Sequence, residues 1–99
     1  MQGYYPLAFE REMGCTEAEL RGWLPGATRE RPIAWSEAGA EISLDGGSVA
    51  ITWRRGEPRR IALIVLPRLQ VSFEARGIDE AAWQRFMRYF DLYTQRGGG

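Results

Sequence analysis

Apolar and polar residues alternate along the middle of the chain, which predicts β-strands that bury one face. The pairs Gly46-Gly47, Gly56-Glu57 and Pro67-Arg68 separate four such segments and are predicted to be their turns. Because side chains alternate along a strand, these turns fix the face that each residue occupies. The pattern predicts a four-stranded antiparallel meander, with a fifth strand if Ile33–Trp35 pairs beside it. One of its faces is apolar throughout and collects Ala40, Ile42, Leu44, Val49, Ile51, Trp53, Ala62, Ile64, Leu66, Leu69, Val71 and Phe73.

The longest apolar run of the chain, Ile61 to Leu66, is the third strand of this predicted meander. Its side chains alternate between the two faces, so Ile61, Leu63 and Val65 would form an apolar column opposite the core. Two interpretations of this column are open. Either the N-terminal segment or the first helix covers it, as is usual for apolar runs in small domains. Or the column is an interface for a second copy or another protein.

Two helices flank the predicted strands. The sequence TEAE at residues 16–19 is a capping box, and it starts a short helix that Pro25-Gly26 is predicted to end. Asp79 is the predicted N-cap of a long C-terminal helix. The apolar residues of that helix recur at helical spacing and are Ala82, Trp83, Phe86, Phe90 and Tyr93. The expected fold class is therefore α+β, with the short helix first, the meander next and the long helix packed on one face.

The two ends of the chain complete this picture. Residues 1–13 contain several apolar side chains together with Pro6, and we expect an extended segment that lies on the body of the protein. No repeat or linker interrupts the chain. We therefore expect a single domain over residues 1–99, with a flexible glycine-rich tail at 95–99.

The same register predicts a row of three arginines, Arg54, Arg59 and Arg76, on neighbouring strands at one end of the far face. Like charges that face one another destabilise a sheet, so this row needs compensation. It is either a solvated charged edge that also blocks aggregation, or a site for an anion, a phosphate backbone or an acidic partner. All 13 basic residues of the chain are arginine, which favours forked anion recognition but is also typical of a GC-rich genome.

The composition argues against an enzyme. The chain has no histidine, which removes the commonest general base and the commonest metal ligand. Cys15 is its only cysteine, and its place before the first helix favours a buried structural role. Phosphate-binding glycine loops and CxxC pairs are missing from the sequence. We expect a protein without catalytic residues, without a cofactor and without a metal ion.

The formal net charge is zero, which makes nucleic acid an improbable partner for the chain as a whole. The N-terminus has neither the basic start nor the apolar core of a signal peptide. No apolar run approaches the length that spans a bilayer. We therefore expect a cytoplasmic protein that does not associate with membranes.

The chain ends in three glycines, and the final pair, Gly98 and Gly99, resembles the tail of ubiquitin-like and sulfur-carrier proteins. In those families an activating enzyme adenylates the terminal carboxylate, and the tail follows a strand. Here it follows a predicted helix, where glycine commonly serves as the C-cap and a flexible end.

Two longer stretches resemble a small family of uncharacterised proteobacterial proteins: LAFEREMGCTEAELRGWLPGA, residues 7–27, and RFMRYFDLYTQRGGG, residues 85–99. The resemblance runs the whole length of the chain. It implies a single-domain cytosolic bacterial protein whose three terminal glycines are native, and it implies no function.

Three functions are compatible with these patterns. The first is a non-enzymatic protein-interaction module, homodimeric through Ile61, Leu63 and Val65. The second is an anion-binding or nucleic-acid-binding protein that uses the arginine row. The third is a carrier protein with an activated C-terminal diglycine.

Overall fold

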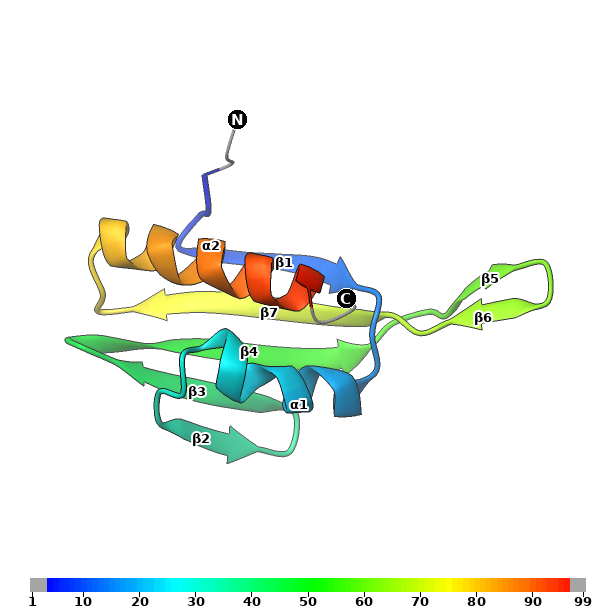
Figure 1. Ribbon diagram of the computed structural model, residues 1–99, viewed down its shortest axis with the longest axis horizontal. Helices are drawn as coiled ribbons and strands as arrows, with labels where there is room; N and C mark the ends of the chain where they lie inside the picture. Colours follow the sequence, from blue (N-terminus) through cyan, green and yellow to red (C-terminus); the bar gives the residue numbers. More distant parts are fainter. Residues whose placement is uncertain (1–3, 97–99) are drawn as a thin grey trace.

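The computed structural model describes residues 4–96, which form two layers (Figure 1). One layer is a five-stranded antiparallel sheet, and the other consists of two helices that pack on one face of it. The predicted class, α+β with the C-terminal helix on an antiparallel sheet, is confirmed. The elements are β1 (Ala8–Met13), α1 (Glu17–Ala27), β2 (Ile33–Ser36), β3 (Gly39–Leu44), β4 (Gly47–Arg55), β5 (Arg59–Ile61), β6 (Ile64–Leu66), β7 (Leu69–Arg76) and α2 (Glu80–Arg96).

The strand order in the large sheet is β1-β7-β4-β3-β2, and every neighbouring pair is antiparallel. β2 corresponds to the additional strand that the sequence analysis considered at Ile33–Trp35. β1 lies within the N-terminal segment that was predicted to be extended, and it pairs along its whole length with β7. The N-terminal segment is therefore an edge strand of the sheet.

The turn between β3 and β4 lies one residue earlier than predicted. Leu44 pairs with Gly47, so Asp45 and Gly46 form the turn, and Gly46 has a φ of 84°. Moving the turn centre by one residue shifts the pairing by two, which leaves each side chain on its predicted face. The buried residues of β3, β4 and β7 are accordingly the predicted ones: Ala40, Ile42, Val49, Ile51, Trp53, Leu69, Val71 and Phe73.

The third predicted strand is not part of this sheet. β4 pairs directly with β7, so nothing lies between them. The intervening chain leaves the sheet, and the Gly56 N–H donates to the Arg68 carbonyl oxygen (2.8 Å) where it departs and returns. The prediction of a central strand at residues 61–66 is therefore wrong. The three residues that this strand assigned to the buried face are instead exposed: Ala62, Ile64 and Leu66.

Two physical reasons keep this segment out of the sheet. Pro58 and Pro67 flank the apolar run, and a proline has no N–H to give to a central ladder. A central strand here would also place an apolar column on the face that neither helix covers. That open face carries polar and small side chains: Glu10, Glu12, Glu41, Ala50, Thr52, Gln70, Ser72 and Glu74.

The first helix, α1, has the predicted start and a later end. The Thr16 hydroxyl accepts from the Glu19 N–H (3.1 Å), and the Glu19 carboxylate accepts from the Thr16 N–H (2.9 Å). Pro25 was expected to end the helix, but it lies within its last turn, where it cannot donate an N–H to the carbonyl four residues earlier, and α1 ends two residues later at Ala27. A Cβ at Gly26 would overlap the Tyr93 ring, so this glycine allows α1 and α2 to approach closely.

The second helix, α2, lies over the sheet as predicted, with Met87 as an additional buried residue. Side chains from the N-terminal segment fix its position. Arg11 of β1 forms an ion pair with Asp91 of α2, and the Tyr5 hydroxyl donates to the same carboxylate (2.5 Å). Burial and this hydrogen bond raise the pKa of Tyr5 to about 12.

Candidate functional site

The hairpin of β5 and β6 projects from one end of the sheet (Figure 1). Ala62 and Leu63 form its turn, and Ala62 has a φ of 55°. This left-handed conformation costs a residue with a Cβ about 1–2 kcal/mol. The hairpin is held by three antiparallel pairs: Arg59 with Leu66, Arg60 with Val65, and Ile61 with Ile64.

One face of this hairpin carries three apolar side chains, the other carries a single apolar side chain opposite Arg60, and both faces are exposed. Residues paired across two strands share a face, so Leu66 lies on the face of Ile61 and Ile64, whereas Val65 lies on the other. Their exposed fractions range from 41% to 58%, and Leu63 at the tip is 100% exposed. Buried apolar residues of the sheet expose at most 6%. We call Ile61, Leu63, Ile64, Val65 and Leu66 the apolar hairpin surface.

The structure brings the predicted interface residues together in a different arrangement. Ile61, Leu63 and Val65 were expected to form one column on a flat sheet face. The turn at Ala62 lies between them, so Ile61 and Val65 point to opposite faces of the hairpin and Leu63 occupies its tip. The predicted apolar column is therefore wrong. Within residues 4–96, neither the N-terminal segment nor the first helix covers these residues, and no other element buries them.

The predicted arginine row is also wrong. Arg54 pairs with Gln70, whereas Arg76 pairs with Ser48 at the opposite end of the β4–β7 ladder, about 20 Å away. Arg76 forms ion pairs there with Glu74 (2.9 Å) and with a glutamate of β3 (3.7 Å). Arg59 lies on the hairpin, outside the large sheet, so the three arginines do not form a row.

A different group of arginines surrounds the hairpin. Arg68 forms an ion pair with Glu12 of β1, and within residues 4–96 the other members of the group form none. Glu57 is the one acid between positions 54 and 68, so this stretch of the chain carries an excess of positive charge. We call this group the hairpin arginines: Arg54, Arg55, Arg59, Arg60 and Arg68.

A cavity of about 720 Å³ lies at the base of the hairpin. Its apolar wall includes Trp53, Pro58, Val65, Pro67 and Leu69, and Arg54, Arg55 and Arg68 lie around it. The opposite wall comes from the start of α1, where the Trp53 indole N–H donates to the Glu17 carboxylate (3.1 Å). That hydrogen bond, with a second one from Arg21, holds the pKa of Glu17 below its ordinary value.

Cys15 also lines this cavity, but its side chain is almost fully buried. It immediately precedes the N-cap Thr16, a position that tends to lower a thiol pKa. Burial has the larger effect here, and with the nearby Glu19 carboxylate it raises the pKa of Cys15 to about 11. The thiol is therefore protonated and unreactive at neutral pH.

Other features of the chain bear on its function. In the described part of the chain, no group of three or more acidic and cysteine side chains is arranged to hold a metal ion. No helix within residues 4–96 is long and apolar enough to cross a membrane. Gly98 and Gly99 lie outside the described residues, so the carrier function stays a prediction.

No protein-family model matches the sequence, and no curated protein is significantly similar to it. The resemblance of residues 7–27 and 85–99 to proteobacterial proteins therefore stays a prediction. The site has to be interpreted from its own geometry.

Sequence reasoning missed two of the five residues of the apolar hairpin surface. It assigned Ile64 and Leu66 to the core because a regular alternation was continued through a run that is apolar at every position. It also overlooked Arg55, Arg60 and Arg68. The flanking prolines and the Arg59-Arg60 pair were the features that could have marked this run as a projecting hairpin.

Proposed function

We propose that this protein is a non-enzymatic interaction module that forms homodimers through the apolar hairpin surface. The observation that carries the proposal is the exposure of five large apolar side chains within six consecutive residues. The patch is on the order of a few hundred Å², as large as the largest apolar patches that monomers expose, which are usually functional. The other exposed large apolar residues are distributed over other elements: Tyr4, Leu7, Trp35 and Leu92.

A second argument comes from the stability of the hairpin itself. A two-stranded hairpin alone in water is marginally stable at best and needs packing against another element. Here neither face of the hairpin is covered by residues 4–96, and Ala62 adds a strained turn. A partner that covers both faces and pairs with an open strand edge supplies the missing stabilisation.

A second copy of the chain fits this hairpin as a partner. Two hairpins that lie side by side in antiparallel orientation obey two-fold symmetry, in which each residue makes its partner's contact in return. From Gly56 to Leu63 the hairpin extends roughly 23 Å. Antiparallel alignment therefore brings each Leu63 tip to the base of the other hairpin, where the 720 Å³ cavity offers an apolar wall.

The charges are compatible with this arrangement. The hairpin arginines would repel one another across a two-fold axis unless acids compensated them. The chain carries its own compensation, since its net charge is zero and the open face of β1 and β7 presents Glu10, Glu12 and Glu74. Arg68 already contacts Glu12 in this way.

The decisive experiment measures mass across a hundredfold range of protein concentration by light scattering after gel filtration. We expect a species of twice 11.3 kDa. The triple variant Ile61→Thr, Leu63→Asn, Ile64→Thr keeps strand and turn propensity but removes three of the five residues of the apolar hairpin surface, and it should be monomeric. Leu92→Gln is the matched control, because Leu92 is equally exposed (53%) but lies on α2, and it should remain dimeric. A wild-type protein that is monomeric at every concentration contradicts the proposal.

A second candidate function is nucleic-acid or other polyanion binding, favoured by the hairpin arginines. A projecting β-ribbon with arginines along it is a geometry that reads nucleic-acid grooves. A gel shift at low salt should then be lost in Arg54→Gln, Arg59→Gln. Arg76→Gln should retain it, because Arg76 lies at the far end of the sheet. No shift at low salt excludes this function.

A further inference from the structure

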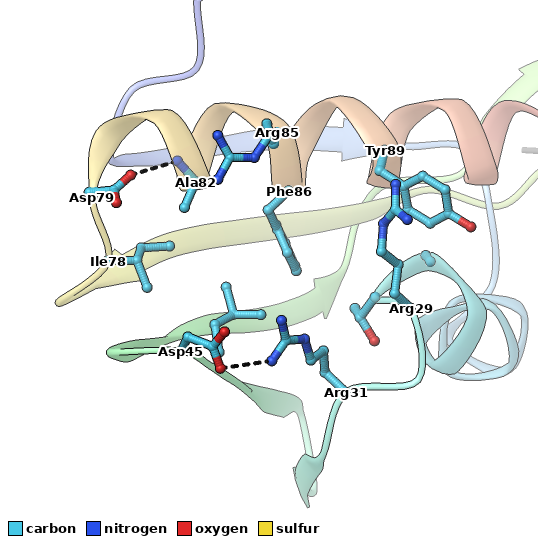
Figure 2. Close-up of a pocket in the computed structure, with 12 residues that line it drawn as sticks. Arg29, Arg31, Asp45, Ile78, Asp79, Ala82, Arg85, Phe86 and Tyr89 are labelled. Carbon is cyan, nitrogen blue, oxygen red and sulfur yellow. Dashed lines mark hydrogen bonds and ion pairs between the residues drawn. The ribbon is translucent and has the colours of Figure 1, made fainter.

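A second cavity, of about 360 Å³ (Figure 2), lies near the start of α2, at the end of the sheet away from the hairpin (Figure 1). It exists because α1 ends at Ala27 and leaves the Leu44 end of β3 without a helix above it. Leu44, Ile78 and Phe86 remain only half-buried there and provide apolar walls. Its volume is within the usual range for small-molecule sites.

Three arginines from two separate parts of the chain line this cavity. Arg29 and Arg31 follow α1, and Arg85 projects from α2 (Figure 2). Within residues 4–96, Arg29 and Arg85 form no ion pair. Guanidinium groups that line one cavity repel one another, and an anion that binds in the cavity is attracted to each of them.

Neither acid that lines the same cavity holds an arginine in a buried ion pair. The Asp79 carboxylate accepts from the Ala82 N–H (2.8 Å) and so caps α2. Asp45 does pair with Arg31 (3.3 Å), but the Asp45 side chain is 96% exposed. An ion pair so open to water contributes little and is readily exchanged for a better ligand.

The segment that carries Arg29 is held in an unusual backbone conformation. Arg29 and Glu30 have φ values of 57° and 61°, in the left-handed region that residues with a Cβ seldom adopt. In this conformation the Arg29 guanidinium lies 3.9 Å from the centre of the Tyr89 ring. Strained residues of this kind are concentrated at ligand sites. The cation is therefore oriented against α2 before any ligand arrives.

We propose that this cavity binds a small organic anion with a planar apolar body. Its carboxylate or phosphate lies among Arg29, Arg31 and Arg85, and its ring packs against Phe86. Figure 2 shows Phe86 pointing from α2 into the cavity, above Arg31. This site is independent of the hairpin, and neither proposal depends on the other.

The test is a titration followed by amide and arginine side-chain NMR, with phenyl phosphate and phenylacetate as probes. Inorganic phosphate and benzyl alcohol serve as the two halves of the ligand. We expect saturable shifts at Tyr89 and Arg85 for at least one of the two anionic aromatic probes, and much weaker binding of each half. Binding of phenyl phosphate but not phenylacetate identifies phosphate as the preferred group, and the reverse identifies carboxylate.

Two variants with opposite expected effects on affinity test whether the probes bind in this cavity. Arg85→Gln should weaken binding about tenfold, as expected for the loss of a charged hydrogen bond. Asp45→Asn removes an acid from the rim and should strengthen binding about twofold. Arg54→Gln, an arginine at the hairpin end, should change nothing. Absence of saturable shifts for both anionic probes overturns the site, as does equal binding by the Arg85→Gln variant with its fold intact by thermal melting.

Discussion

Val71 and Phe73 in β7 and Ile61 and Ile64 in the hairpin are similar side chains in opposite environments. The first two are buried beneath α2 in a continuous core. The other two are about half exposed, although they belong to the most hydrophobic segment of the chain. This difference in burial is caused by the elements that surround each strand, because the side chains themselves are similarly apolar. An apolar run is buried only where another element is available to cover it.

The sharpest contrast between the two regions is energetic. Phe73 stacks on Phe9 (ring centres 5.0 Å apart) and meets Phe90 edge-on (5.3 Å). Phe73→Ala should therefore lower the free energy of unfolding by about 3–5 kcal/mol. Leu63→Ala should change it by less than about 0.5 kcal/mol. Chemical denaturation at a low protein concentration, where association is negligible, measures both values. Equal losses would show that the hairpin belongs to the cooperative core.

Thiol chemistry provides the next largest contrast. Because the pKa of Cys15 is raised to about 11, modification by a disulfide reagent near pH 8 should be at least about a hundredfold slower in the native protein than in urea. In a Cys15→Ala background, Val65→Cys should react rapidly at low protein concentration and slowly at high concentration. Val65 is half exposed in one copy, and the proposed dimer covers it.

The raised pKa of Cys15 also predicts a pH dependence. A group whose pKa is higher in the folded state binds protons more tightly there, so its contribution to stability is complete below the pKa of the unfolded thiol. That contribution is lost as pH rises toward 11. Relative to Cys15→Ala, the wild-type protein should lose about 1–2 kcal/mol between about pH 9 and 11. A constant difference between the two proteins would show that the folded thiol titrates normally.

Removal of the whole hairpin should also have only a small effect on the stability of the monomer. Because Gly56 and Arg68 are already joined by a backbone hydrogen bond, residues 57–67 can be replaced by Asn-Gly as a tight turn. We expect the thermal midpoint of the monomer to change by no more than a few degrees, because these residues contribute nothing to the core. An unfolded product would refute the separation of hairpin and body.

The comparison also shows which parts of the structure a sequence can predict. The faces of β3, β4 and β7 follow from alternation, which tolerates a turn that is misplaced by one residue. Both helices follow from local caps and helical spacing. The position of residues 61–66 does not, because it depends on the non-local pairing of β4 with β7. An apolar run fits equally well inside a sheet and on a projecting hairpin.

The candidate sites were harder to predict than the fold. Arg54 lies near the base of the hairpin, but Arg59 is on the hairpin and outside the large sheet, and Arg76 was placed beside them by an error of register. The cavity with Arg29, Arg31 and Arg85 depends on where α1 stops above the sheet. No local pattern connects these three residues, and only the packing of α1 and α2 brings them together.

Hydrogen–deuterium exchange resolved to single amides, at low and at high protein concentration, tests the central claim most directly. The account predicts that amides of β4 and β7 are protected at both concentrations. Amides of β5 and β6 should exchange freely at low concentration, as in an isolated hairpin, and become protected at high concentration as copies associate. Exchange at β5 and β6 that does not depend on concentration, whether fast or slow, would contradict it.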